Sequence, residues 1–165
     1  MAAGTGRDKL AATREQEYSM RLTTFSDYTL RVLIYLAVQD QAVTTIAGIA
    51  EAYGISKNHL MKVVHQLAGE GYVETTRGKG GGVRLKRAPE DISIGAVLRR
   101  TESDSALVEC FRPEGSECRI ETACMLRGVF HQAEEAFYGV LDDITLAQVV
   151  EDRARLQALL PGTAD

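Results

Sequence analysis

The sequence predicts a mainly α-helical fold with one small β-wing, and three observations lead to this fold class. Apolar residues recur at helical spacing in several segments between residues 24 and 160. Two short strand-like runs, YVETT and VRLKR, flank a glycine-rich tip, RGKGGG. The length of 165 residues suits one domain of ordinary size with a real hydrophobic core.

The first two helices are predicted from apolar stripes behind threonine caps. The segment TTFSDYTLRVLIYLAVQD predicts a helix behind a cap at Thr24. Its stripe consists of Phe25, Tyr28, Val32, Leu33 and Leu36. The segment TTIAGIAEAYG predicts a shorter helix that ends at Gly54, where a left-handed residue commonly stops a helix.

The third helix is predicted from SKNHLMKVVHQLAGEG, with Ser56 as its cap. Its core stripe consists of Leu60, Val63, Val64 and Leu67. The short turn YGIS before it makes the second and third helices a helix-turn-helix. The opposite face offers side chains that can meet base edges and phosphates: Ser56, Lys57, Asn58, Met61, Lys62 and His65.

The hairpin after this helix resembles a basic wing. Glycines let its tip bend without a side-chain penalty, while Arg77 and Lys79 carry positive charge toward a phosphate or the minor groove. A nucleotide-phosphate loop is the alternative, but no GxGxxG or Walker pattern opens a helix here. Helix, turn, recognition helix and wing together predict a winged helix-turn-helix domain that binds double-stranded DNA.

The charge distribution agrees with such a partner. The net charge is −4, yet residues 57–87 hold seven basic against two acidic side chains. Residues 102–165 hold five basic against thirteen acidic side chains. A compact basic stretch in an acidic protein is what phosphate attraction on one face requires. A solvated basic face is the alternative.

The C-terminal half predicts three further helices. Ser93 caps a fourth helix, ISIGAVLRRTE, and Thr145 caps a closing helix, LAQVVEDRARLQALL. Between them a long helix carries a heptad seam of Leu126, Phe130, Ala133, Phe137, Val140 and Ile144. Pairing along this seam would give a homodimer that reads a palindromic operator, whereas a core-packing helix is the structural alternative.

All the cysteines, Cys110, Cys118 and Cys124, lie in one fifteen-residue segment. The N-terminus lacks the apolar stretch of a signal peptide, and no apolar run approaches the length of a membrane span. We therefore expect a cytoplasmic protein with no membrane partner, in which clustered thiols indicate metal or redox chemistry. The spacing suits an iron-sulfur cluster, because zinc sites more often contain a C-x-x-C pair; three unrelated buried thiols are the alternative.

These elements divide the chain into four parts. Residues 1–19 form a polar extension, 20–102 the winged-helix domain, 103–124 the cysteine loop, and 125–160 the dimerisation and C-terminal helices. An enzyme is not expected, because no nucleophile-base arrangement is present and His59 and His65 fall on the recognition helix.

Over about residues 20–160 the chain resembles the NsrR and IscR group of bacterial winged-helix regulators. The RGxGGG wing tip and the segment LVECFRPEGSECRIETACMLRGVF carry this resemblance. It implies a homodimeric transcriptional repressor whose iron-sulfur cluster is held by Cys110, Cys118 and Cys124. The cluster would be [4Fe-4S], with [2Fe-2S] as the alternative, and its nitrosylation by nitric oxide would release promoter DNA.

Three cysteines leave a four-iron cluster one ligand short. One branch of the group has a histidine three residues after the last cysteine, where this chain has Arg127. The other branch uses an aspartate of the first helix, and Asp27 of this chain matches its position. We expect the partner subunit to supply this aspartate. From spacing alone, Thr24 and Asp27 form a capping box, and His131 is a less favoured ligand. An IscR-type redox regulator and a zinc or thiol switch without a cluster stay open as alternatives.

Overall fold

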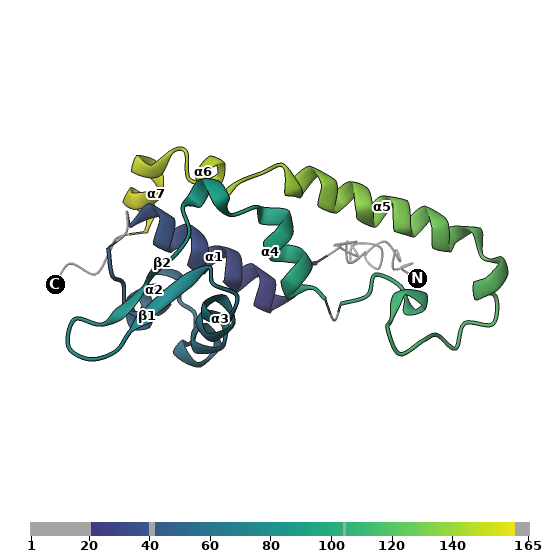
Figure 1. Cartoon of the computed structure of the whole chain (residues 1–165), viewed down its shortest axis with the longest axis horizontal. Helices are drawn as coiled ribbons and strands as arrows, with labels where there is room; N and C mark the ends of the chain where they lie inside the picture. Colours follow the sequence, from purple (N-terminus) through teal and green to yellow (C-terminus); the bar gives the residue numbers. More distant parts are fainter. Residues whose placement is uncertain (1–20, 40–41, 104, 161–165) are drawn as a thin grey trace, which may run out of the picture.

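The computed structural model describes residues 21–39, 42–103 and 105–160 (Figure 1). The expected polar extension 1–19 lies outside the described residues. The winged helix-turn-helix part contains α1 (Thr24–Val38), α2 (Ile46–Tyr53), α3 (Lys57–Gly69), β1 (Val73–Thr76), β2 (Gly82–Leu85) and α4 (Ile94–Thr101). The remaining helices are α5 (Met125–Asp142), α6 (Leu146–Val149) and α7 (Arg153–Leu159). The predicted fold class, mainly helical with a two-stranded wing, is confirmed.

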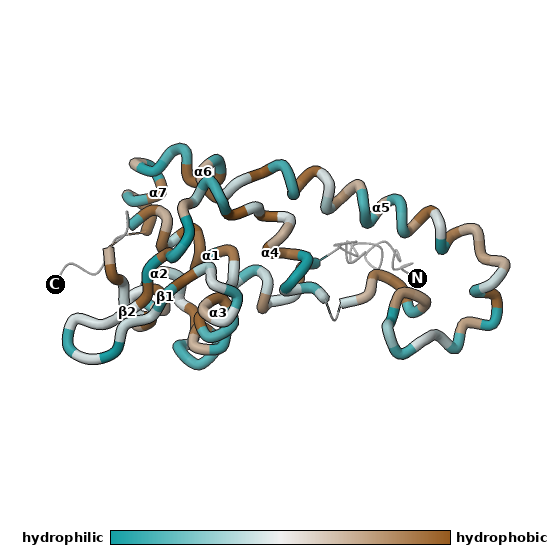
Figure 2. Tube along the Cα trace, in the orientation of Figure 1, coloured by the Kyte–Doolittle hydropathy of each residue, from teal (hydrophilic) through white to brown (hydrophobic). Residues whose placement is uncertain are grey.

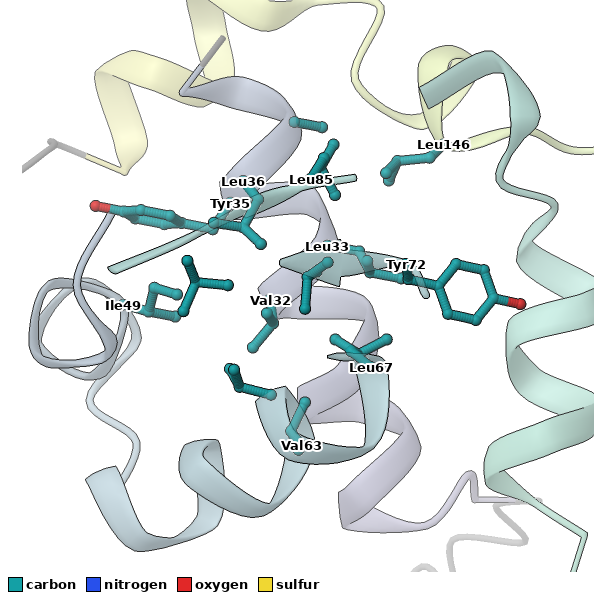
Figure 3. Close-up of a cluster of buried hydrophobic side chains, with 14 of the residues drawn as sticks. Val32, Leu33, Tyr35, Leu36, Ile49, Val63, Leu67, Tyr72, Leu85 and Leu146 are labelled. Atoms are coloured by element: carbon teal, nitrogen blue, oxygen red, sulfur yellow. The ribbon is translucent and has the colours of Figure 1, made fainter. Parts of the chain in front are cut away.

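Helix α1 is the centre of the hydrophobic core (Figure 3). It contacts α3, β2, α4, α6 and α7, so apolar side chains point in several directions from it. Val32 and Leu33 are fully buried, and each such side chain contributes about 1.5–3 kcal/mol by leaving water. The core stripe expected for α3 is buried throughout, at Leu60, Val63, Val64 and Leu67.

The cap of α1 differs from the expectation. Thr23, and not Thr24, caps this helix, and its side-chain oxygen accepts from the backbone N–H of Ser26. The capping box expected between Thr24 and Asp27 is therefore wrong. The Asp27 carboxylate instead pairs with the Arg31 guanidinium one turn later, at 2.8 Å. The caps expected for α3 and α4, Ser56 and Ser93, are confirmed.

The wing is an antiparallel pair in which Val73 faces Leu85 and Thr76 faces Gly82. Its strands are shorter than the two runs that predicted them. Arg87 fixes the base of this hairpin, because its guanidinium lies 4.4 Å from the centre of the Tyr72 ring. The same guanidinium donates to the carbonyl oxygens of Glu70 and Gly71 at the end of α3. The wing is thus attached directly to the recognition helix.

Helix α5 projects from this body along the long axis of the molecule (Figure 1). None of its residues is buried. Arg99 of α4 holds its C-terminal end: the guanidinium pairs with Asp142 at 2.9 Å and lies 4.4 Å from the centre of the Tyr138 ring. The expected heptad seam extends beyond the helix, because its last residue, Ile144, follows the end of α5 and packs against the core.

The single closing helix expected after Thr145 is wrong, because two short helices, α6 and α7, take its place. Thr145 forms the expected cap, in a capping box with Gln148. The chain turns at Val150, which is buried, and Asp152 caps the next helix. Within the described ranges, no helix is both long and apolar enough to cross a membrane.

Replacing Gly95 by alanine tests the contact between α4 and α5. A Cβ atom at Gly95 would lie 2.5 Å from the backbone nitrogen of Asp142, so the two helices would have to separate. We expect Gly95→Ala to lower the free energy of unfolding by about 1–3 kcal/mol. Urea denaturation measures this, with Gly139→Ala as the control.

Gly139 lies on α5 with open space around its Cβ position. There the substitution should raise stability by about 0.5–1 kcal/mol, because alanine favours a helix over glycine. Equal effects of the two substitutions would contradict the close approach at Gly95.

Candidate functional site

The exposed face of α3 carries the side chains expected to meet DNA. Ser56, Lys57, Asn58, Met61, Lys62 and His65 are all exposed. Met61 is an apolar side chain left 50% accessible on this face. Because the opposite face of α3 is fully packed, these side chains cannot turn inward without breaking the core.

Helix α1 contributes to the same surface, which the sequence pattern did not reveal. Phe25 borders a hollow of about 670 Å³ that several α3 side chains line, including Asn58, Met61 and Lys62. The ring of Tyr28, one turn further along α1, lies 5.9 Å from the ring of His59. Phe25 and Tyr28, expected in the core stripe, thus also reach the recognition helix.

Arg77 and Lys79 lie exposed in the tip between the two wing strands. Gly78 and Gly80 have positive φ angles of 96° and 80°, a conformation that side-chain-bearing residues rarely adopt. The charges at the wing tip are therefore presented by a turn that requires glycine.

The cysteine loop places two of its three thiols around one hollow. Cys110 and Cys124 are half-buried and line an open space of about 810 Å³ at the start of α5. Arg127 and His131 of α5 line the same space. Cys118 is exposed and lies on the turn between them, after Gly115 with its positive φ of 99°. In the described part of the chain no three His, Cys, Asp or Glu side chains lie close enough to hold a single metal ion.

Local contacts hold the loop against α5. The Phe111 ring meets the His131 ring edge to face, with centres 6.2 Å apart. Glu121 pairs with Arg127 at 3.6 Å. Sulfur donors are the usual ligands of iron-sulfur clusters, and the hollow has room for a group larger than one ion. The cysteine residues therefore fit such a group in their chemistry.

Asp27 lies elsewhere in the chain. It borders a hollow of about 510 Å³ with Arg31 and Tyr53 on the winged-helix body. The Arg31 guanidinium lies 5.8 Å from the centre of the Tyr53 ring, and burial raises the pKa of Tyr53 to about 12. Figure 1 shows the cysteine loop beyond this body, beneath the far half of α5. One subunit thus does not bring Asp27 to its own cysteines.

The helix-turn-helix, the exposed basic face of α3 and the glycine-tipped wing define a winged-helix DNA-binding protein. The sequence profile of the Rrf2 family, described as an iron-dependent transcriptional regulator, matches residues 22–152. The chain belongs to the Rrf2 family. It is therefore a transcriptional regulator and not an enzyme.

Curated relatives are named as transcriptional regulators as well. The HTH-type transcriptional regulator NsrR of Geobacillus kaustophilus is 49% identical over 142 residues, which cover 86% of this chain and 97% of that protein. The regulator of the same name from Bacillus subtilis is also 49% identical, with the same coverage.

Solved structures support the fold. Oxidised CymR of Staphylococcus aureus matches 80% of this chain and 97% of its own with a TM-score of 0.63 at 28% identity. T. potens IscR matches 84% of this chain and 92% of its own with a TM-score of 0.64 at 24% identity. The second likeness concerns the fold alone.

Proposed function

We propose that this protein is a homodimeric repressor that senses nitric oxide through an iron-sulfur cluster and then releases its promoter. The observation that carries the proposal is the hollow at the start of α5, which Cys110 and Cys124 line together. The similarity to proteins named NsrR supports the same reading.

Cys110, Cys118 and Cys124 would hold the cluster, which we take to be [4Fe-4S]. Cys118 would approach the other two by movement of the turn around Gly115, which is exposed. When bound, the cluster supplies iron that reacts with nitric oxide. The Arg127 guanidinium beside the hollow offsets the negative charge that thiolate ligands bring.

Dimerisation would use α5, several of whose apolar side chains are exposed in the subunit. Figure 2 shows hydrophobic positions recurring along this helix. The exposed ones are Met125, Leu126, Val129, Phe130 and Val140, of which Met125 is 81% accessible. An apolar helix face of this length favours a protein partner over water. A second copy, related by a two-fold axis, would bury it and present two recognition helices to a palindrome.

Asp27 would complete the cluster of the partner subunit. The dimer brings the loop of one subunit toward α1 of the other, and the carboxylate would exchange Arg31 for iron. A carboxylate released from the cluster would pair again with the Arg31 guanidinium of its own helix. Because Tyr28 of α1 contacts His59 of α3, a shift of α1 changes the pose of the recognition helix.

A thiol or zinc switch without a cluster is the second candidate. Cys118 is exposed, and an accessible thiol is open to oxidation. Anaerobic purification decides between the two, because the proposal requires iron and acid-labile sulfide in the isolated dimer, whereas zinc or metal-free protein with unchanged DNA binding contradicts it.

The DNA surface is tested by salt titration. Replacing Arg77 or Lys79 by alanine should weaken operator binding and reduce the slope of log affinity against log salt by about one unit each. The loss of affinity on replacing Asn58 or Lys62 should depend more on the operator sequence, because these side chains would face base edges. Electrophoretic or anisotropy titrations across salt concentrations measure both. Unchanged binding by all four variants would remove this surface from consideration.

The dimer is tested by placing charge on α5. Phe130→Glu and Phe137→Glu should give monomers, because a buried unpaired carboxylate at an interface costs several kcal/mol. Sedimentation velocity measures the mass of each variant. Gln132→Glu, which adds the same charge at an exposed position of the helix off the seam, is the control and should leave the dimer intact. Dimers of both phenylalanine variants would move the interface elsewhere.

The shared ligation is tested with mixed dimers. Asp27→Ala should leave the cluster in place but change its absorption spectrum and its reaction with nitric oxide. A dimer is then formed from one subunit with Asp27→Ala and one lacking all three cysteines. Ligation across the interface predicts one wild-type site in this heterodimer. If the mixture contains only a three-thiolate site, the aspartate and the cysteines of a cluster must come from the same subunit.

A further inference from the structure

Glu102 is the one charged side chain that is buried among the described residues, with 8% of it exposed. It follows the last residue of α4 and directly precedes the cysteine loop, residues 103–124. A carboxylate is removed from water at a cost unless hydrogen bonds replace the lost hydration. Its partners therefore indicate what this residue does.

Both partners of Glu102 belong to Thr23, the cap of α1. One carboxylate oxygen, Oε1, accepts from the Thr23 backbone N–H at 2.7 Å and from the Thr23 hydroxyl at 2.9 Å. The carboxylate thus lies at the N-terminus of α1, where the helix dipole favours negative charge. Hydrogen bonds to an ionised acceptor are stronger than those between neutral groups.

The next step along the chain reaches Asp27. The backbone N–H of Asp27 donates to the carbonyl oxygen of Thr23 at 3.0 Å. Two hydrogen-bond steps therefore join Glu102 to the residue that we propose as a cluster ligand. A second path runs in parallel, because the fully buried Ser26 hydroxyl donates to the Thr101 hydroxyl at 2.7 Å.

We propose that Glu102 is a positioning residue that holds the N-terminus of α1 so that Asp27 can reach the cluster of the partner subunit. This inference rests on the proposed function. This role of Glu102 also links the two clusters of a dimer. In each subunit Glu102 directly precedes the cysteine loop and fixes Asp27 of the same subunit. That Asp27 is then a ligand of the cluster held by the other subunit's cysteine loop.

The experiment measures how fast the ferrous chelator bipyridine removes iron from the anaerobic, cluster-loaded dimer. Asp27→Ala should accelerate iron removal by opening one iron site. Glu102→Ala should accelerate it about tenfold, the factor that corresponds to losing a hydrogen bond to a charged acceptor. Glu102→Gln should give a rate between those of the wild type and Glu102→Ala, because its amide oxygen can accept both hydrogen bonds from Thr23 but carries no charge.

The double variant Asp27→Ala with Glu102→Ala distinguishes positioning from general loosening. If Glu102 acts through Asp27, the double variant should lose iron no faster than Asp27→Ala alone. Multiplied rates would overturn the proposal. Glu135→Ala is the control, because this carboxylate pairs with Arg99 of α4 and should leave the rate unchanged.

Failures of the two proposals have different signatures. If Asp27→Ala itself does not change the rate, the cross-subunit ligation of the proposed function fails. If Asp27→Ala accelerates iron loss but Glu102→Ala does not, only the positioning role fails. Should Glu102→Ala not fold, Glu102→Asp keeps the charge but shortens the side chain by one carbon, and must accelerate iron loss in the same non-additive way. A wild-type rate for Glu102→Asp would then overturn the role of Glu102.

Discussion

The structure depends on the burial of α1. This helix contacts the recognition helix, the wing, α4 and both closing helices, so it cannot shift without moving the surfaces around it. Densely packed interiors transmit displacement between neighbours because they contain few voids to absorb it. A ligand bond at the exposed N-terminal end of α1 could therefore alter the pose of α3. The same end carries Asp27 and, through Tyr28, touches His59.

Different kinds of contact stabilise the two parts of the subunit, the winged-helix body and helix α5. The winged-helix body is joined by apolar packing, which is strong but has little directional preference (Figure 3). The C-terminal end of α5 is held by Arg99, by the close approach at Gly95 and by Tyr138 and Leu141, which pack against the core. Exposed ion pairs contribute little to stability by themselves. The outer half of α5 is thus well suited to take its final position from a second subunit.

Patterns within one element allowed much of the fold to be predicted from the sequence. The stripe of α3, the caps at Ser56 and Ser93 and the glycine-tipped wing all depend on neighbours within a few residues. The sequence does not distinguish Thr23 from Thr24 as the cap of α1, because the two are adjacent and of the same residue type. The structure adds a hydrogen bond from Thr23 to Glu102, 79 positions away, which no local pattern indicates. The break between α6 and α7 likewise lies at Val150, which is buried in a core built by distant segments.

The candidate site is predictable in its chemistry and less so in its geometry. Cysteine spacing identifies the residues that can hold a cluster, because ligand type is a property of the side chain. The spacing does not tell that Cys110 and Cys124 share a hollow while Cys118 stays on an exposed turn. Nor does it tell that Asp27 is paired with Arg31. If Asp27 binds iron as proposed, that pair gives the carboxylate a partner when iron is absent, so the carboxylate has a partner in either state. An aspartate with two alternative partners of this kind is suited to reversible sensing. Because the carboxylate has a partner in both states, the free energies of the two states differ by less than they would if one state left it without a partner.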